Sequence, residues 1–320
     1  MDTIYDLLDS KHLEFLEDVL HGLSQQQKSI PSKWFYDEAG SHLFEDITRT
    51  REYYPTRVET RLLHQVSEEI GQFTKQLNVL IEPGSGASLK TRILFESSLN
   101  IDTYIPVDIS EAFLHRNALQ LQKDFPRIRT IPLVGDFTKS LPPLGLGAHD
   151  KKLLFFPGST VGNFSPIEAR SLLRSFNHLV GQGGWLLIGV DSTQDREQLL
   201  AAYNDIQGIT AEFNKNLLKR ANRELRANFD LERFSHEARY NEDDHLIEMH
   251  LVSDCEQTVT LGGKVFGFAA GETIFTESCY KYPTQDFLAM ADDSGWRMEH
   301  AWMDDLESRF QIFLLRAKPG

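Results

Sequence analysis

The chain has 320 residues, 41% of them hydrophobic, and a formal net charge of −14. It is long enough for one large or two modest domains, and its acidic excess argues against nucleic acid or an anionic membrane surface as a partner. We expect a cytoplasmic protein, because the chain has only two cysteines, shows no basic and apolar leader, and contains no apolar run near the roughly 18 residues of a membrane span.

The N-terminal part is predicted to be helical and aromatic. An amphipathic helix is expected over residues 10–23, with Ser10 as its N-cap, and a polar linker over residues 25–31. Six aromatic side chains within residues 34–54 lie outside any long periodic segment, and they form either core or the wall of a small-molecule pocket. A second amphipathic helix is predicted over residues 57–76.

A cofactor loop is predicted next. The apolar run over residues 77–81 indicates a buried parallel strand, which ends in Glu82 and the turn Gly84-Ser85-Gly86, before a helix begins at Thr91. Glycine lacks the Cβ that would keep the backbone away from a ligand. The free N–H groups of a helix start favour an anionic or carboxylate-bearing group.

This segment can be compared with three known kinds of nucleotide-binding loop. A Walker A loop needs a glycine before Lys90 and Thr91, but Leu89 stands there. A dinucleotide fingerprint needs a third Gly or Ala at the same position. The acidic, two-glycine loop of S-adenosylmethionine (AdoMet) methyltransferases remains, and the alternative is a tight turn without a ligand.

From this loop onward, strands alternate with helices. Strands are predicted at residues 104–108, 129–134, 152–156 and 184–190, and helices at residues 111–124, 166–180 and 194–204. Such alternation predicts a parallel sheet that helices cover on both faces.

Acidic residues stand at three successive strand ends: Glu82, Asp108 and Asp136. In doubly wound folds, the carboxylate at the position of Asp108 binds ribose hydroxyls. Asp136 is suited to accept a hydrogen bond from an adenine amine while Phe137 packs on the ring. Each acid alone is as readily a loop or helix-cap residue, and Ser110 is another candidate cap. Together, the three predict a nucleoside-containing cofactor.

The pattern changes beyond residue 195. A helical stretch over residues 196–226 precedes short alternating segments, whose turns at residues 241–244 and 261–263 predict antiparallel hairpins. Strands at residues 296–304 and 310–316 are expected to return to the sheet as an antiparallel edge. We predict an α/β fold, the class I methyltransferase Rossmann-like sheet, with an inserted α+β substrate-binding domain. The predicted division is 1–60, 61–195, 196–285 and 286–320.

Seven segments carry a resemblance to a known family. They are KWFYDEAG at residues 33–40, EYYPTR at 52–57, PGSTVGN at 157–163, AY at 202–203, TAEFNKN at 210–216, IEM at 247–249 and FAAGE at 268–272. In these segments the chain resembles the histidine Nα-methyltransferases of ergothioneine biosynthesis. The resemblance runs from about residue 30 to the end. It implies an AdoMet-dependent methyltransferase that converts L-histidine to its trimethyl betaine, hercynine, and releases S-adenosylhomocysteine.

The resemblance also implies a cofactor site. Together with the loop itself, the residues expected to bind AdoMet are Tyr36, Phe44, Glu82, Gly84, Ser85, Gly86, Lys90, Asp108, Asp136 and Phe137. Among these, Tyr36 and Phe44 are expected to close over the cofactor. No metal is expected.

A free amino acid is the small-molecule substrate that the resemblance implies. Its expected binding residues are Tyr53, Gly158, Asn163, Tyr203, Thr210, Met249, Glu277 and Cys279. Tyr53 and Tyr203 would bind the carboxylate through their hydroxyls, and Asn163 and the Gly158 region would position the α-amine; Tyr53, Asn163 and Tyr203 are the implied catalytic residues. Glu277 would hydrogen-bond the imidazole.

One position departs from the family pattern. The histidine enzymes carry a serine two residues beyond the imidazole-binding acid, where this chain has Cys279. Cysteine is a poor hydrogen-bond donor, so the second imidazole contact is weakened, unless Cys279 is simply a tolerated small residue. Histidine leads as the substrate, with tryptophan, tyrosine or a modified histidine as alternatives. Methylation of another amine and non-catalytic AdoMet binding are the remaining hypotheses, and a monomer is expected.

Overall fold

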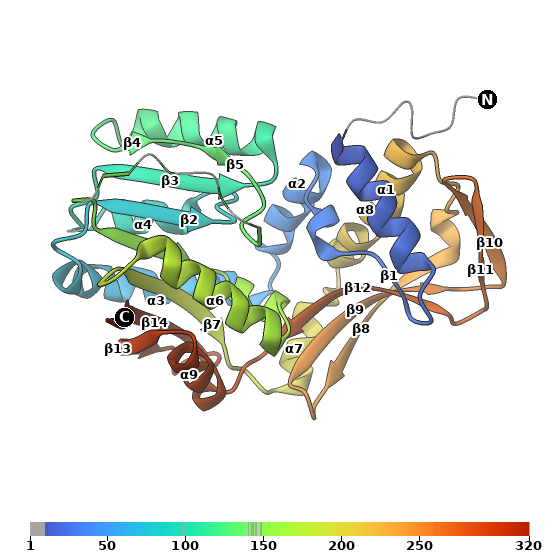
Figure 1. The fold of residues 1–320 in the computed structure, drawn as a ribbon. Helices are drawn as coiled ribbons and strands as arrows, with labels where there is room; N and C mark the ends of the chain where they lie inside the picture. The colour runs from blue at the N-terminus through green and yellow to red at the C-terminus, as the bar shows by residue number, and fades with distance from the viewer. Residues whose placement is uncertain are drawn as a thin grey trace. The chain divides into compact units, whose positions relative to one another are not determined.

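The structure, a computed structural model, describes residues 10–97, 99–139, 141, 144, 146–147 and 149–319. Its chain divides into two compact units (Figure 1). The first unit consists of the described residues up to Tyr53 together with Asp195–Cys279, and the second consists of Tyr54–Gln194 and the described residues from Tyr280 onward. The chain therefore passes three times from one unit to the other. The four-part division of the chain stays a prediction.

The second unit is built on one large sheet. Its strands are β2 (Val79–Pro83), β3 (Thr103–Asp108), β4 (Arg129–Thr130), β5 (Leu133–Val134), β6 (Lys152–Phe156), β7 (Trp185–Asp191), β13 (Trp296–Met303) and β14 (Phe310–Ala317). They follow the order β13-β14-β7-β6-β2-β3-β4, and β5 also pairs with β3. The pairs β13–β14 and β14–β7 are antiparallel and the others are parallel. A reversed late strand in a parallel sheet confirms the predicted fold class.

Helices pack on this sheet through apolar stripes at helical spacing. They are α3 (Tyr54–Phe73), α4 (Leu89–Phe95), α5 (Glu111–Asp124), α6 (Pro166–Val180) and α9 (Thr284–Asp293). α6 and α9 share an apolar core with β6, β7 and β14, and α3 contacts β13 and β14. Ser165 and Glu168 form a capping box that fixes the start of α6. The sequence analysis does not predict α9.

The predicted strand over residues 129–134 is in fact two short strands, β4 and β5, which both pair with β3. Pro132 lies between them. Proline has no N–H group to donate to a sheet, so the regular ladder is interrupted and resumes at Leu133.

The first unit combines helices with two small sheets. Its helical segments are α1 (Ser10–Leu23), η2 (Ser32–Phe35), α2 (Glu38–Ile47), α7 (Arg196–Ala202), α8 (Ile209–Leu225) and η4 (Leu231–Arg233). Its strands are β1 (Lys28–Ser29), β8 (Phe234–Asn241), β9 (Leu246–Ser253), β10 (Gln257–Leu261), β11 (Lys264–Phe268) and β12 (Thr273–Tyr280). One sheet has the order β1-β12-β9-β8, and β10 pairs with β11 in the other. Both predicted hairpins, β8–β9 and β10–β11, are confirmed.

Three local predictions for this unit are wrong in part. The predicted linker contains β1, in which Lys28 pairs with Ile274 of β12. The predicted helical stretch over residues 196–226 breaks after α7, because Gly208 adopts a left-handed φ of +73° immediately before α8. Ser10, the predicted N-cap, is the first helical residue of α1, and its side chain lies outside the described residues.

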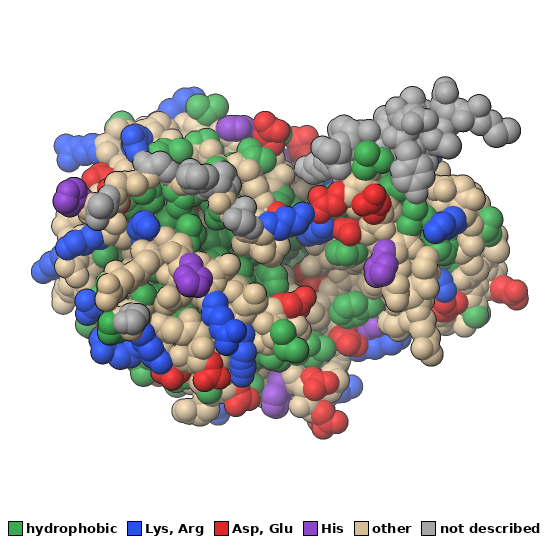
Figure 2. All heavy atoms as spheres, viewed as in Figure 1, with side chains coloured by type: hydrophobic (Ala, Val, Ile, Leu, Met, Phe, Trp, Pro, Cys, Tyr) green, Lys and Arg blue, Asp and Glu red, His purple; other side chains and the backbone are tan. Residues whose placement is uncertain are grey.

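The surface shows charges of both signs. Acidic and basic side chains are interspersed over the face drawn in Figure 2. The acidic excess of the sequence is therefore not gathered into one patch on that face. Within the described residues, no helix combines the length and the apolar character needed to cross a membrane.

Candidate functional site

The carboxyl ends of four parallel strands form one edge of the large sheet. β2 and β3 pair Pro83 with Val107, and β3 continues to Asp108, where it pairs with β5. The predicted acids Glu82, Asp108 and Asp136 therefore lie at or just beyond neighbouring strand ends, as expected. We call the segments at this edge the strand-end site: residues 82–90, 108–110, 135–138 and 157–163.

The loop after β2 combines two left-handed glycines with an unpartnered buried hydroxyl. Gly84 and Gly86 have φ angles of +67° and +51°, a conformation that glycine adopts without strain. A Cβ atom at Gly84 would lie 3.3 Å from the ring of Phe137. The hydroxyl of Ser85 is buried and has no hydrogen-bond partner among the described residues. An orphaned buried hydroxyl needs a partner, so a polar ligand at this loop fits the residues present.

Glu82 supports the same loop from within the protein. Its carboxylate accepts hydrogen bonds from the hydroxyl of Thr91, at 2.5 Å, and from the hydroxyl of Tyr104. The Tyr104 hydroxyl also lies 2.9 Å from the hydroxyl of Ser88. Burial raises the pKa of Glu82 to about 7, although the two hydroxyl donors and Lys90 act to lower it. The sequence analysis misses Tyr104, because its polar end is not visible in an apolar strand pattern.

Asp108 ties the loop after β2 to the start of α5. One carboxylate oxygen accepts from the backbone N–H of Gly86 at 3.0 Å, and the other accepts from that of Ser110 at 2.9 Å. Ser110 stands at the N-cap position of α5, but its side chain makes no capping hydrogen bond. Main-chain donors thus hold the Asp108 side chain in one orientation.

Asp136 and Phe137, the residues predicted to bind adenine, lie just beyond the end of β5. One oxygen of Asp136 accepts from the N–H and the hydroxyl of Thr138, at 2.9 and 2.6 Å. The ring of Phe137 lies edge-to-face with those of Phe156 and Phe164, at centroid distances of 5.6 and 6.2 Å. Packing on two sides fixes this ring beside the loop after β2.

The loop after β6 is held by a carboxylate that the sequence analysis does not single out. The N–H of Gly158 donates to both oxygens of Glu59, at 3.0 and 2.8 Å, and Lys90 forms an ion pair with the same carboxylate. The hydroxyl of Ser159 accepts from the N–H of Asp191 at 2.9 Å. Glu59 therefore joins the start of α4 to the loop that follows β6.

A row of aromatic rings, which we call the aromatic chain, runs through the first unit. It consists of Tyr36, Phe44, Tyr53, Tyr203 and Phe213. Tyr36 and Phe44 lie 5.9 Å apart between centroids, Phe44 and Tyr53 6.2 Å, and Tyr53 and Tyr203 6.3 Å, all edge-to-face. Phe213 contacts both Tyr36 and Phe44, at 5.8 and 6.0 Å. The structure thus brings four predicted site residues together.

Tyr203 is surrounded by other predicted substrate residues. Burial raises the pKa of its hydroxyl well above the ordinary value, with further contributions from Cys279, Tyr53 and Glu277. Cys279 is also its hydrogen-bond partner. Glu277 and Cys279 are both buried and lie two positions apart on β12, so they point to the same face of the sheet. At neutral pH the hydroxyl is protonated and can donate a hydrogen bond.

His236 fixes the backbone of Tyr203. Its Nε2 lies 2.8 Å from the carbonyl oxygen of Tyr203, and its Nδ1 lies 2.9 Å from the side-chain amide nitrogen of Asn214. Because an amide nitrogen is a donor, Nδ1 accepts and Nε2–H donates. Burial lowers the pKa of His236, which keeps the imidazole neutral. The sequence analysis misses this histidine, which carries no local signal.

Two further predicted residues are held by backbone contacts in the first unit. The N–H of Thr210 donates to Asp205 at 2.7 Å, at the start of α8. The carbonyl oxygen of Met249 accepts from the hydroxyl of Thr276 on β12 at 3.0 Å. Both residues are buried.

The predicted site residues thus fall into two sets. The strand-end site contains the predicted cofactor residues of the second unit, together with Gly158 and Asn163. The first unit contains the aromatic chain and the other predicted substrate residues, with Tyr36 and Phe44 among them. In the described part of the chain, no group of three or more His, Cys, Asp or Glu side chains is placed to hold a metal ion.

Comparisons with known proteins show the family of the chain. Residues 15–317 match the family model described as histidine-specific methyltransferase, SAM-dependent. The chain is 36% identical to a histidine N-alpha-methyltransferase of Mycobacterium tuberculosis, in an alignment of 302 residues that covers 93% of each protein. It is 37% identical to the histidine N-alpha-methyltransferase of Mycolicibacterium smegmatis, in an alignment of 308 residues that covers 94% of each protein. It is 27% identical to an N-methyltransferase of Aspergillus flavus, over 92% of this chain and 83% of the relative.

Proposed function

Because the chain belongs to the family of histidine-specific, AdoMet-dependent methyltransferases, we propose that it methylates the α-amine of a free amino acid, with L-histidine as the leading substrate. The proposed end product is the trimethyl betaine, hercynine. The observation that carries this proposal is the buried cluster of Tyr53, Tyr203, Glu277 and Cys279 in the first unit. It offers neutral hydroxyls and one acid among apolar side chains.

We assign AdoMet to the strand-end site. Gly84 and Gly86 allow close approach of the backbone, and the unpartnered hydroxyl of Ser85 offers a hydrogen bond to the ligand. We assign Asp108 to the ribose hydroxyls and Phe137 to the adenine ring. When bound, AdoMet supplies an electrophilic methyl group on a positively charged sulfur.

The first unit is assigned the carboxylate and the side chain of the amino acid. The hydroxyls of Tyr53 and Tyr203 bind the carboxylate as neutral donors, so that no full counter-charge has to be buried. Glu277 accepts a hydrogen bond from an N–H group of the substrate side chain. Asn163 and Gly158, in the second unit, are assigned to the α-amine.

The chemical role of these residues is positioning. A neutral amine has to direct its lone pair at the methyl carbon, in line with the departing sulfur, and orientation of this kind supplies a large part of a rate enhancement. Tyr53 and Tyr203 fix the carboxylate and thereby the adjacent α-carbon, while Asn163 orients the nitrogen. The aromatic rings exclude water. No strong protein base is assigned.

A second candidate substrate class is favoured by Cys279. A thiol donates a weaker hydrogen bond than a serine hydroxyl, and this thiol is buried next to Tyr203. Glu277 still selects a side chain with an N–H donor, so tryptophan and modified histidines are the alternatives.

The test is a turnover assay with AdoMet and each of the proteinogenic amino acids, with release of S-adenosylhomocysteine and product mass as readouts. We expect histidine to gain three methyl groups. If another amino acid is methylated and histidine is inert, the specificity assignment is wrong while the N-methyltransferase assignment stands. AdoMet binding without turnover of any amino acid would contradict the free-amino-acid proposal.

A further inference from the structure

We propose that Glu59 is a positioning residue of the cofactor site, which holds Lys90 and the loop after β6 in place and sets the net charge of that corner. The inference rests on the proposed location of AdoMet in the strand-end site. Glu59 lies on α3, outside every segment that the sequence analysis assigns to the site.

Glu59 is buried, and its contacts reach two segments that are distant in sequence, the start of α4 and the loop after β6. Its side chain is 1% exposed, and that of Lys90, its ion-pair partner, is 15% exposed. The N–H of Gly158 donates to both carboxylate oxygens, at 3.0 and 2.8 Å. One carboxylate therefore fixes a cation from the first turn of α4 and a backbone donor from the loop after β6.

The surrounding residues leave space for this carboxylate and for little else. A Cβ atom at Gly189 of β7 would lie 2.1 Å from an oxygen of Glu59. A Cβ atom at Gly158, whose φ is +82°, would lie 3.7 Å from the nitrogen of Lys90. Any side chain at position 189 would displace Glu59, so the glycine keeps open the space that the Glu59 side chain occupies.

Burial makes the pairing of charges obligatory. A carboxylate removed from water is stable only when it is paired and hydrogen-bonded, and loss of one partner leaves an uncompensated charge. Lys90 is the cation that the structure pairs with Glu59. Together they form a corner of zero net charge in the strand-end site.

The net charge of the Glu59–Lys90 pair affects ligand binding, because AdoMet and S-adenosylhomocysteine, the two ligands proposed for this site, differ in charge. The methionine part of AdoMet carries an ammonium, a carboxylate and a sulfonium, with a net charge of +1, whereas S-adenosylhomocysteine lacks the sulfonium charge. A change of one unit charge in the protein therefore affects the binding of AdoMet more than that of S-adenosylhomocysteine. The ratio of the two dissociation constants reports the charge of the corner and is insensitive to a uniform loosening of the site.

The experiment measures the dissociation constants of AdoMet and S-adenosylhomocysteine by calorimetry, together with Tm. For Glu59→Gln we expect the ratio of the AdoMet constant to the S-adenosylhomocysteine constant to rise about tenfold, because the loss of one negative charge from a partly desolvated site weakens the binding of the more positively charged ligand. Lys90→Met should shift the ratio in the opposite direction. The double variant, which is again neutral, should return the ratio close to that of the wild type.

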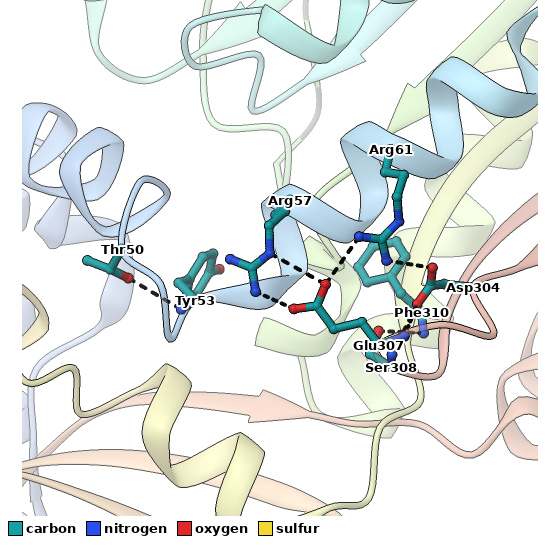
Figure 3. A network of polar contacts seen from close by, with 8 residues as sticks. All are labelled: Thr50, Tyr53, Arg57, Arg61, Asp304, Glu307, Ser308 and Phe310. Atoms are coloured by element: carbon teal, nitrogen blue, oxygen red, sulfur yellow. Dashed lines mark hydrogen bonds and ion pairs between the residues drawn. The ribbon is translucent and has the colours of Figure 1, made fainter.

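The matched control is the ion pair between Arg61 and Asp304, because Arg61 lies on α3 two residues from Glu59. Arg61 pairs with Asp304, whose side chain is 4% exposed, and both belong to the network in Figure 3. This pair lies between the ends of β13 and β14, where Arg61 also bonds Glu307 and the N–H groups of Glu307 and Ser308 donate to Asp304. Asp304→Asn should lower Tm and leave both dissociation constants within about twofold, because it removes a buried charge that the proposal does not place at the ligand.

The outcomes separate the inference from the function on which it rests. A lower Tm for Glu59→Gln with an unchanged ratio would show a purely structural role and overturn the inference. If Asp108→Asn and the wild type bind both ligands equally well, the proposed location of AdoMet is wrong, and the inference falls with it. Opposite shifts for Glu59→Gln and Lys90→Met, cancelling in the double variant, would support the inference.

Discussion

The strand-end site and the aromatic chain are built from different parts of the polypeptide. In the strand-end site, the backbone N–H groups of Gly86 and Gly158 each donate to a buried or half-buried carboxylate. In the aromatic chain the contacts join side chains, as between the rings of Tyr53 and Tyr203 at 6.3 Å. Backbone geometry therefore fixes one site, and side-chain packing fixes the other.

The two sites also differ in charge. Glu59, Glu82 and Asp108 place carboxylates around the loops of the strand-end site. Around Tyr203, burial keeps the hydroxyl neutral, with Glu277 as the nearby acid. Substitutions should therefore act on the strand-end site through charge and on the aromatic chain through hydrogen bonding and shape.

The largest expected effect concerns the charge of Glu82. Because its pKa is about 7 in the folded protein and near 4.5 when unfolded, the folded state binds more protons between these values, and stability falls as pH rises through this window. The penalty is fully present above about pH 7 and amounts to roughly 3 kcal/mol. In Glu82→Gln this penalty is absent. The free energy of unfolding of the variant should therefore improve relative to the wild type between pH 4.5 and 8, as measured by urea titration.

Glu96→Gln is the matched control for this measurement, because Glu96 is exposed at the end of α4. Its difference from the wild type should not vary with pH over the same range. A pH-independent difference for Glu82→Gln as well would mean that the carboxyl group is charged at no cost in the folded protein, contrary to its burial.

The second prediction concerns Glu277, the acid that lies near Tyr203 of the aromatic chain. Glu277→Gln should lower kcat/KM for histidine about 100-fold, since hydrogen bonds to charged groups contribute about 1.5–3 kcal/mol. The KM for AdoMet should change little. Steady-state kinetics with each substrate varied in turn measures both values.

Glu237→Gln is the control for Glu277→Gln, because Glu237 lies in the same sheet and pairs with Arg239 at an exposed position. It should behave as the wild type. If Glu277→Gln weakened AdoMet as much as histidine, the assignment of the first unit to the amino acid would be contradicted.

The smallest expected effect is at Cys279. Cys279→Ser replaces a weak donor with a stronger one beside Tyr203, so KM for histidine should fall by about three- to tenfold, corresponding to part of one neutral hydrogen bond. Cys255→Ser, at the half-buried second cysteine, should leave KM unchanged. A rise in KM for Cys279→Ser would favour a substrate other than histidine.

The sequence alone predicts the parts of the strand-end site that are local. Residues 77–91 contain the strand, the glycine turn and the helix start in one segment, and Asp108 and Asp136 follow strands that apolar runs reveal. Parallel strands align their carboxyl ends, so this local information was sufficient to group the three acids. The hairpins of the first unit were equally predictable, because alternation and turn residues are local signals.

Other features depended on residues that are far apart in the chain. The pairing of β1 with β12 joins Lys28 to Ile274, and the break before α8 depends on a left-handed Gly208 that a helical pattern conceals. His236 reaches the carbonyl of Tyr203 only because α7, α8 and β8 pack together. None of these contacts has a signature in the neighbouring sequence.

The large sheet and the glycine turn after β2 can be predicted from the sequence, because periodicity and turn residues act over short distances. Which distant side chains hold these segments in place depends on the tertiary structure. Glu59 bonds Gly158, which lies 99 residues later, and Tyr53 meets Tyr203 across a longer separation still. Burial of a charge or a hydroxyl depends on every element that packs around it, so the pKa values of Glu82 and Tyr203 emerged only from the folded chain.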